Sequence, residues 1–208
     1  MDKELTVQER LFLLFQSEGM LRLSEIKKLG IHYEQVRRLY KEGKLKKLSK
    51  GIYTIAEYDV TEHHSIAEIC KKVPNAVICL LSALIFHDLT TQMPHEIWIA
   101  IGNKAHRPRI KYPPIRIFRF SNKSLSEGIE EHTVEGSIVK VYSPAKTIAD
   151  CFKYRNKIGL DLALEALHDA FRQKKATYNE ILHYARICRI EKTILPYLEA
   201  IAWERSEH

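Results

Sequence analysis

The spacing of apolar residues predicts two helices at the start of the chain. Val7, Leu11, Leu14 and Phe15 fall on one stripe of a first helix, with polar residues on its other sides. A second, shorter helix follows and is closed by Gly30, because glycine readily adopts the left-handed conformation of a helix end. Both helices therefore have one face that must pack against something else.

Residues 32–42 are predicted to form a third helix, and residues 45–55 a hairpin. Val36, Leu39 and Tyr40 recur at helical spacing, so one face of this helix is apolar and packs inward. Strand-forming residues then flank a Ser-Lys-Gly turn, which predicts two strands that fold back on each other. A long helix, a short helix, a tight turn, a third helix and a hairpin follow one another as in a winged helix-turn-helix.

The remaining three quarters of the chain mix helical and strand-like patterns. Residues 76–89 predict a central helix, because a helix that is apolar all round is a buried one. Three strand-like runs follow: 97–101, 115–120 and 138–142. Further helices are expected to begin near Thr61, Ser143, Leu160, Thr177 and Glu191.

These patterns predict an α+β fold with two domains. We expect a winged helix-turn-helix domain over residues 1–57 and, after a polar connection, a C-terminal domain over residues 61–208. The second domain should be a mixed α/β structure with a small sheet and several helices.

Positive charge concentrates in the third helix and the hairpin. Between Arg37 and Lys50 there are seven basic residues and a single acid, Glu42. Residues 1–55 hold 12 basic and 7 acidic side chains, so most of the net charge of +7 lies there. Duplex DNA carries about one negative charge per 1.7 Å of its axis, and Lys and Arg neutralise it. A basic helix followed by a basic hairpin therefore predicts double-stranded DNA as a partner.

The candidate DNA contacts divide by position. The candidates for base edges lie at the start and middle of the third helix: Tyr33, Gln35, Arg37 and Arg38. Arg prefers guanine and Gln prefers adenine in the major groove. Lysines of the hairpin are the candidates for phosphates, which fix position without reading sequence. The plain alternative for basic residues on a helix is a solvated surface, but the order of elements and the scarcity of acids favour DNA. The complete set is Tyr33, Gln35, Arg37, Arg38, Lys41, Lys44, Lys46, Lys47 and Lys50.

Residues that would point to an enzyme are scarce. The histidines lack the spacing of metal ligands, and no glycine-rich loop follows a strand. Glu96, Glu135, Lys140 and Asp150 match the carboxylates and lysine of a metal-dependent nuclease only weakly. We therefore predict no catalytic residues, no metal and no cofactor.

The cysteines and the apolar segments indicate a cytoplasmic protein. Cys70, Cys79, Cys151 and Cys188 are scattered without paired spacing, as expected for small buried residues in a reducing compartment. The longest apolar segment, residues 76–86, is far shorter than a bilayer requires, so no membrane partner is expected. No signal peptide is visible.

Three segments are distinctive enough to compare with known families. Residues 74–101 read PNAVICLLSALIFHDLTTQMPHEIWIAI, residues 143–167 read SPAKTIADCFKYRNKIGLDLALEAL, and residues 47–55 read KLSKGIYTI. Together they resemble the AbiEi antitoxins of bacterial abortive-infection toxin–antitoxin systems. The resemblance covers nearly the whole chain, in family order.

This resemblance implies a transcriptional autorepressor that is also an antitoxin in phage defence. In that family the winged helix binds inverted repeats in the promoter of its own operon, and the C-terminal domain opposes a nucleotidyltransferase-like toxin. The pair is described as type IV, in which the antitoxin acts without forming a stable complex with the toxin. The family's pattern supplies no catalytic set to carry over.

A second basic set lies in the C-terminal domain and keeps two interpretations open. Its members are Lys104, Arg107, Arg109, Lys146, Lys153 and Arg155. One interpretation is an ion-paired helix surface, since Lys146 and Asp150 are four residues apart. The other is a patch that faces RNA or the toxin. At the level of the whole protein, two alternatives also stay open: a ligand-sensing transcription factor without an antitoxin role, and a nuclease or RNA-modifying enzyme.

Overall fold

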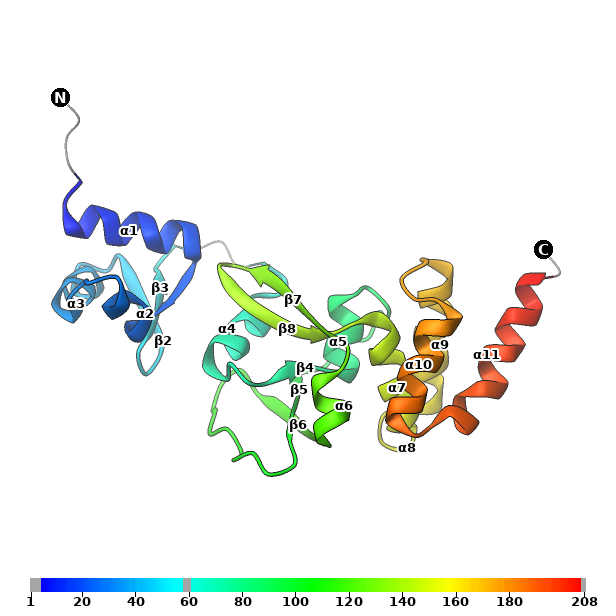
Figure 1. The fold of residues 1–208 in the computed structure, drawn as a ribbon. Helices are drawn as coiled ribbons and strands as arrows, with labels where there is room; N and C mark the ends of the chain where they lie inside the picture. The colour runs from blue at the N-terminus through cyan, green and yellow to red at the C-terminus, as the bar shows by residue number, and fades with distance from the viewer. Residues whose placement is uncertain (1–4, 58–60, 207–208) are drawn as a thin grey trace. The chain divides into compact units, whose positions relative to one another are not determined.

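A computed structural model describes residues 5–57 and 61–206 and shows a chain of mixed helices and strands (Figure 1). Its contacts form two compact units. The N-terminal unit runs to Pro74 and includes Thr133–Val139, and the C-terminal unit comprises Asn75–His132 and the chain from Lys140 onward. Residues 58–60, part of the polar connection expected between the two domains, lie outside the described residues.

The N-terminal unit contains a winged helix-turn-helix, as predicted. Its three helices and a hairpin follow in the expected order, and a short strand that was not predicted completes an antiparallel sheet of order β1-β3-β2. The elements are α1 (Val7–Glu18), β1 (Met20–Arg22), α2 (Leu23–Lys28), α3 (Tyr33–Lys41), β2 (Leu45–Ser49) and β3 (Ile52–Ile55).

Local signals and one shared core explain these elements. Thr6 and Glu9 form a capping box that starts α1. The apolar stripes of the three helices meet the sheet in a core that includes Leu11, Phe15 and Leu39. Strand β1 has only three residues, too few for an alternating pattern to be recognised in the sequence. The predicted fold class is confirmed for this part of the chain.

The N-terminal unit also holds α4 (His64–Lys72) and the turn of the β7–β8 hairpin. Thr61 was expected to cap this helix, but His63 occupies the cap position. The Thr61 backbone amide and hydroxyl each donate a hydrogen bond to the Glu135 carboxylate at 2.8 Å, and His64 Nδ1 lies 2.6 Å from it. Burial alone would raise the pKa of Glu135, but these hydrogen bonds lower it below its ordinary value.

The C-terminal unit is built on a five-stranded sheet of order β6-β5-β4-β8-β7. Its strands are β4 (Val77–Ile78), β5 (Ile97–Gly102), β6 (Ile115–Phe120), β7 (Ile129–Val134) and β8 (Ser137–Tyr142). Strands β5 and β6 run parallel in register, from Ile97↔Ile115 to Gly102↔Phe120. The three strands expected from the sequence are present, whereas β4 and β7 were not predicted.

The apolar run at residues 76–89 is not one helix, and that prediction was wrong. It forms β4, which pairs with β5 and β8, and then the short helix α5 (Leu80–Phe86). Leu80 marks the change with a φ of 48°. Continuous burial gives a strand and a helix the same all-apolar appearance, so periodicity could not separate them.

Among the described residues, six further helices complete the C-terminal unit, and α7 lies at their centre. They are α6 (Asn122–Ser126), α7 (Pro144–Lys153), α8 (Arg155–Ile158), α9 (Leu160–Arg172), α10 (Tyr178–Cys188) and α11 (Glu191–Ser206). Ser143 caps α7 as expected, and eight consecutive residues of α7 are buried. Helix α7 packs against α5, α9, α10 and α11. Among the described helices, none has both the length and the apolar character needed to cross a membrane.

Gly136 supplies the first testable prediction. It lies in the turn between β7 and β8 with a φ of 65°, and a Cβ there would lie 1.8 Å from the Glu18 carbonyl oxygen. We expect Gly136→Ala to lower the free energy of unfolding by more than about 2 kcal/mol, because backbone strain and a steric clash add together. Urea denaturation of the full chain measures this.

Gly43→Ala is the matched control. Gly43 also has a positive φ, 74°, but no heavy atom lies within 4 Å of the added Cβ. Only the backbone strain should remain, so the loss should be about 1 kcal/mol. Equal losses in the two variants would show that the contact with Glu18 does not constrain the turn.

Candidate nucleic-acid interface

Helix α3 separates its apolar and charged faces. Its first turn is capped by His32, whose Nδ1 accepts a hydrogen bond from the Glu34 amide at 3.4 Å. Val36 and Leu39 are buried in the core, while Arg37, Arg38 and Lys41 are exposed. The helix therefore turns its positive charge outward because its other side is fixed in the core.

Three tyrosines join α3 to the hairpin. The rings of Tyr40 and Tyr53 meet edge to face, with centroids 5.9 Å apart. Burial and a hydrogen bond with Tyr33 raise the pKa of Tyr53. Tyr33 contacts Tyr53 of the strand through this hydrogen bond, yet Tyr33 is 45% exposed to solvent. These contacts fix the helix against the strand that follows the basic turn.

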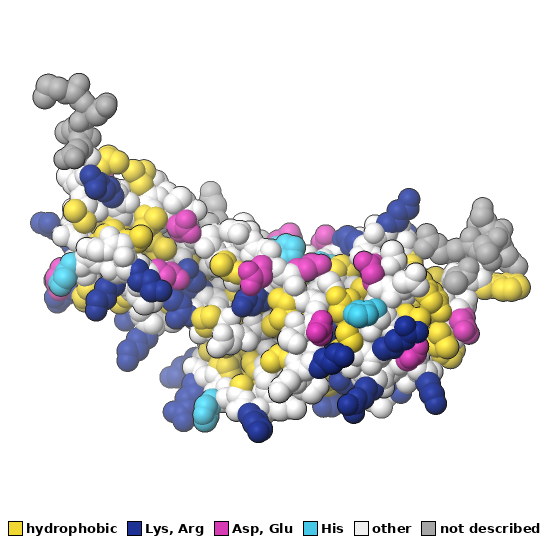
Figure 2. All heavy atoms as spheres, viewed as in Figure 1, with side chains coloured by type: hydrophobic (Ala, Val, Ile, Leu, Met, Phe, Trp, Pro, Cys, Tyr) yellow, Lys and Arg dark blue, Asp and Glu magenta, His cyan; other side chains and the backbone are white. Residues whose placement is uncertain are grey.

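The hairpin carries the second group of charges. Lys47 and Lys50 are exposed and Lys46 is half-buried, and the pairing of β2 with β3 is irregular between Lys47 and Ser49. Figure 2 shows Lys and Arg side chains gathered over α3 and the hairpin. Eight of the nine predicted DNA contacts lie on these two elements, and Lys44 lies in the turn that joins them. Each is at least partly exposed, so the fold brings the whole set together.

Few acids oppose these charges. Glu34 lies 3.5 Å from Arg37, and Glu42 lies 3.0 Å from Lys44 and 3.9 Å from Arg38. All three are exposed ion pairs, which stabilise a protein little and exchange readily for other partners. Within the described part of the chain, Lys41, Lys46, Lys47 and Lys50 form no ion pair. A phosphate could therefore take any of these four as its counterion.

The second predicted set does not form one patch. Lys104, Arg107 and Arg109 are exposed in the loop after β5, whereas Lys153 and Arg155 are half-buried. Arg155, at the start of α8, donates to the carbonyl oxygen of Phe152 in α7 at 3.0 Å. These residues come from separate segments of the C-terminal unit, and only the loop members are fully exposed.

Lys146, a member of the same predicted set, lies in the protein interior. Its side chain is completely buried, and its Nζ lies 2.5 Å from Asp150 Oδ2, which is also completely buried. The ammonium group lies 4.2 Å from the centroid of the Tyr142 ring and 5.0 Å from that of Phe120. The ion pair expected from the four-residue spacing is present, but it lies inside the protein and not on its surface.

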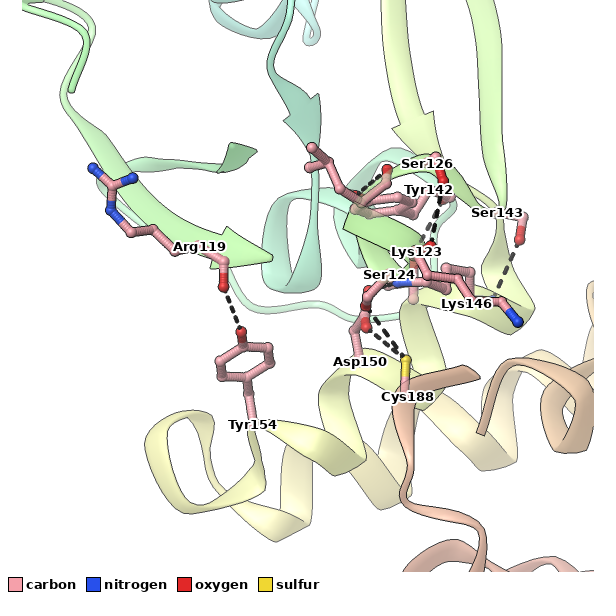
Figure 3. A network of polar contacts seen from close by, with 12 residues as sticks. Arg119, Lys123, Ser124, Ser126, Tyr142, Ser143, Lys146, Asp150, Tyr154 and Cys188 are labelled. Carbon is pink, nitrogen blue, oxygen red and sulfur yellow. Dashed lines mark hydrogen bonds and ion pairs between the residues drawn. The ribbon is translucent and has the colours of Figure 1, made fainter. Parts of the chain in front are cut away.

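Figure 3 shows further polar contacts of this buried ion pair. The thiol of Cys188 donates to Asp150 Oδ1 at 3.2 Å, and Ser124 Oγ lies 3.8 Å from the same sulfur. Gly128 leaves room for the lysine, because a Cβ at that position would lie 2.7 Å from Lys146 Cβ. The network thus joins α6, α7 and α10, which supports a structural role.

Burial raises the pKa of Asp150 and of the cysteines near it. For Cys79 and Cys151 the pKa lies well above the ordinary value. Burial also raises the pKa of Cys188 to about 11. A thiol becomes a nucleophile only as a thiolate, so these cysteines are unreactive near neutral pH. The prediction that all four cysteines are buried is confirmed.

Carboxylates and histidines of the described residues form no group of three or more that could hold a metal. Glu96 is exposed beside the basic loop, and Asp150 is committed to Lys146. His87, which has no ligand-like neighbours in the sequence, lies 2.8 Å from the Tyr142 carbonyl oxygen through its Nε2. Burial lowers the pKa of His87.

One known family is similar to the winged-helix module. Residues 9–56 match the family described as "Transcriptional regulator, AbiEi antitoxin". The match runs from the first turn of α1 to the end of β3, so it confirms the predicted resemblance over this module. The two C-terminal segments that carried the rest of the resemblance lie outside the matched residues. No curated protein matches the chain.

The Lys146–Asp150 pair yields a second prediction. We expect Asp150→Ala to lower the free energy of unfolding by about 3–5 kcal/mol, because it leaves a buried ammonium group without its counterion. Urea denaturation followed by circular dichroism would measure this loss.

A double variant separates loss of the partner from loss of packing. Lys146→Met combined with Asp150→Leu removes both charges and keeps most of the volume, so it should recover at least half of the loss. A double variant as unstable as Asp150→Ala would mean that the charges themselves are not what the single variant disturbs.

Proposed function

We propose that the chain is a DNA-binding autorepressor of its own operon and the antitoxin of an abortive-infection toxin–antitoxin pair. The family match over residues 9–56 supports the regulatory half, since that family is described as a transcriptional regulator and antitoxin. The winged helix offers a surface for DNA binding, because its helix α3 and its hairpin place positive charge on one folded module.

The observation that carries the DNA-binding half is the exposed positive charge on α3 and the hairpin. A recognition helix enters the major groove with its exposed face, and here that face bears Arg37 and Arg38. Their guanidinium groups can donate two hydrogen bonds to one guanine. Lys46, Lys47 and Lys50 follow on the hairpin, where they would meet the phosphate backbone.

The antitoxin half rests on the family's description and on the resemblance of the C-terminal segments. The C-terminal unit has its own large apolar core, so it can act separately from the winged helix. We propose that it opposes a nucleotidyltransferase-like toxin in the cytoplasm without a stable complex, as in type IV systems. Inverted repeats in the promoter would then bind two copies of the chain.

Alanine variants test the assignment of residues to bases and phosphates. Arg37→Ala or Arg38→Ala should weaken binding to the upstream region of the operon by roughly 1–3 kcal/mol, with little effect on a scrambled duplex. Lys46→Ala and Lys47→Ala should weaken both duplexes alike and reduce the slope of log K against log salt by about one each. Gel-shift titrations at several salt concentrations measure both quantities.

The two classes of variant serve as controls for each other. If the arginine and lysine variants weakened the two duplexes in the same way, the assignment to base edges would be wrong. Wild-type protein that ignored its own upstream region at low salt would remove the autorepressor proposal altogether.

A separation-of-function variant tests the two halves of the proposal. Lys46→Glu with Lys47→Glu places two acids on the exposed hairpin, so the full chain should lose repression of a promoter reporter. Co-expressed with the neighbouring toxin gene from an unrelated promoter, the same variant should protect growth as well as the wild type. Loss of protection together with loss of DNA binding, in a folded protein, would contradict an antitoxin role of the C-terminal unit.

A further inference from the structure

Positive charge is segregated a second time, in the C-terminal unit. Residues 97–126 contain seven Lys or Arg and no Asp or Glu, while the rest of that unit has 12 basic and 14 acidic residues. The seven are Lys104, Arg107, Arg109, Lys111, Arg116, Arg119 and Lys123. Among the described residues, none of the seven has an ion-pair partner. Charge of one sign without counter-charge attracts polyanions.

Two of these arginines build the base of the loop between β5 and β6. Arg119 Nη1 lies 2.7–3.1 Å from the carbonyl oxygens of Gly102, Asn103 and Ala105, so it holds the first turn of the loop. The Arg116 guanidinium lies 4.6 Å from the centroid of the Trp98 ring. The loop is therefore fixed at its base, and its remaining cations project from a defined frame.

A groove of about 920 Å³ lies between this loop and the starts of β5 and β6. Arg107, Arg109 and Lys111 supply its charge. Apolar side chains supply the rest of its wall: Pro108, Ile110, Pro114 and Ile115. Tyr112, next to the groove in sequence, is 71% exposed. Cations and apolar surface thus alternate along one segment of chain.

A groove that combines cations with apolar side chains favours single-stranded nucleic acid over a duplex. A duplex keeps its base faces stacked inside and offers mainly phosphates along its outside, so apolar walls add little to its binding. A single strand exposes both phosphates and base faces, and proteins bind it with a positive groove and stacking side chains. Arginines on an edge strand also prevent strand pairing between molecules, but that explains only Arg116 and Arg119 of β6.

We propose that the loop groove, defined by residues 106–111 with Glu96, binds single-stranded RNA. Glu96 is the only carboxylate among the lining residues. Close to phosphates it would be repulsive, but a carboxylate can accept a hydrogen bond from a ribose 2′-hydroxyl, the group that separates RNA from DNA. This site is additional to the duplex interface on α3 and requires neither repression nor toxin neutralisation.

Fluorescence anisotropy with the full chain tests the groove. The probes are a labelled 12-nucleotide RNA of uridine and a deoxyuridine strand of the same length. We expect Arg107→Glu with Arg109→Glu to weaken RNA binding at least about tenfold, because two phosphate contacts become repulsive. Lys174→Glu with Lys192→Glu makes the same change of charge at exposed positions outside the groove and should leave binding within about twofold.

Glu96→Ala tests the preference for RNA. The wild type should bind the RNA more tightly than the deoxyuridine strand, and the variant should lose at least half of that difference in binding free energy. A wild type that binds both strands equally would overturn the assignment to RNA. If the double Glu variant proves unfolded by circular dichroism, Arg107→Gln with Arg109→Gln tests the same contacts without introducing acids.

Hairpin variants test whether the RNA site is separate from the duplex site. Lys46→Glu with Lys47→Glu on the hairpin should abolish duplex binding and leave RNA binding intact. If the groove and hairpin variants each weakened both ligands equally, the groove would be an extension of the duplex site and the proposal would fail. Absence of RNA binding, with loss of toxin protection in the Arg107→Glu, Arg109→Glu variant, would identify the groove as a contact for an acidic protein surface. Duplex binding by the wild type, measured in parallel, shows separately whether the proposed repressor function stands.

Discussion

Exposed positive charge is the condition on which the proposed functions depend. A basic side chain either is buried with a counterion or stays exposed to solvent, and this chain has both kinds. Lys146 is buried, and its Nζ lies 2.5 Å from Asp150 Oδ2, so its charge is paired inside the protein. Lys41, Lys46, Lys47 and Lys50 stay hydrated and unpaired among the described residues, on elements whose other faces are buried. Only charge of the second kind can release counterions from a nucleic acid.

The sequence predicted most of the winged helix because each signal there is local. The spacing of Val36 and Leu39 determines which face of α3 is buried, and it thereby exposes Arg37, Arg38 and Lys41. The candidate DNA set could therefore be gathered before the fold was known. The tyrosine contacts between α3 and β3 could not, because Tyr33 and Tyr53 are 20 positions apart in the sequence and meet only through tertiary packing.

The errors in the C-terminal part have a common cause. The spacing of apolar and polar residues predicts which face of an element is apolar, but it does not show which other elements pack against each face. From Ala76 to Leu84 every residue is buried, so strand β4 and helix α5 have the same all-apolar pattern as one central helix. In α7 the polar residues Lys146 and Asp150 looked like a solvated edge, whereas α6 and α10 close over them. A polar pair four residues apart has the same spacing whether it lies in water or in the core.

The two basic surfaces differ in what holds them, and this difference bears on what each can recognise. On α3 the charges follow a regular helix fixed to the sheet by Val36, Leu39 and the tyrosines, so their spacing is constant, as reading base edges in a groove of regular geometry requires. In the β5–β6 loop Arg119 holds the base, and the cations of residues 104–111 lie in no helix or strand of the described residues. A single strand has no fixed geometry of its own, so a loop with a firm base and an irregular charged segment can follow its backbone where a helix could not.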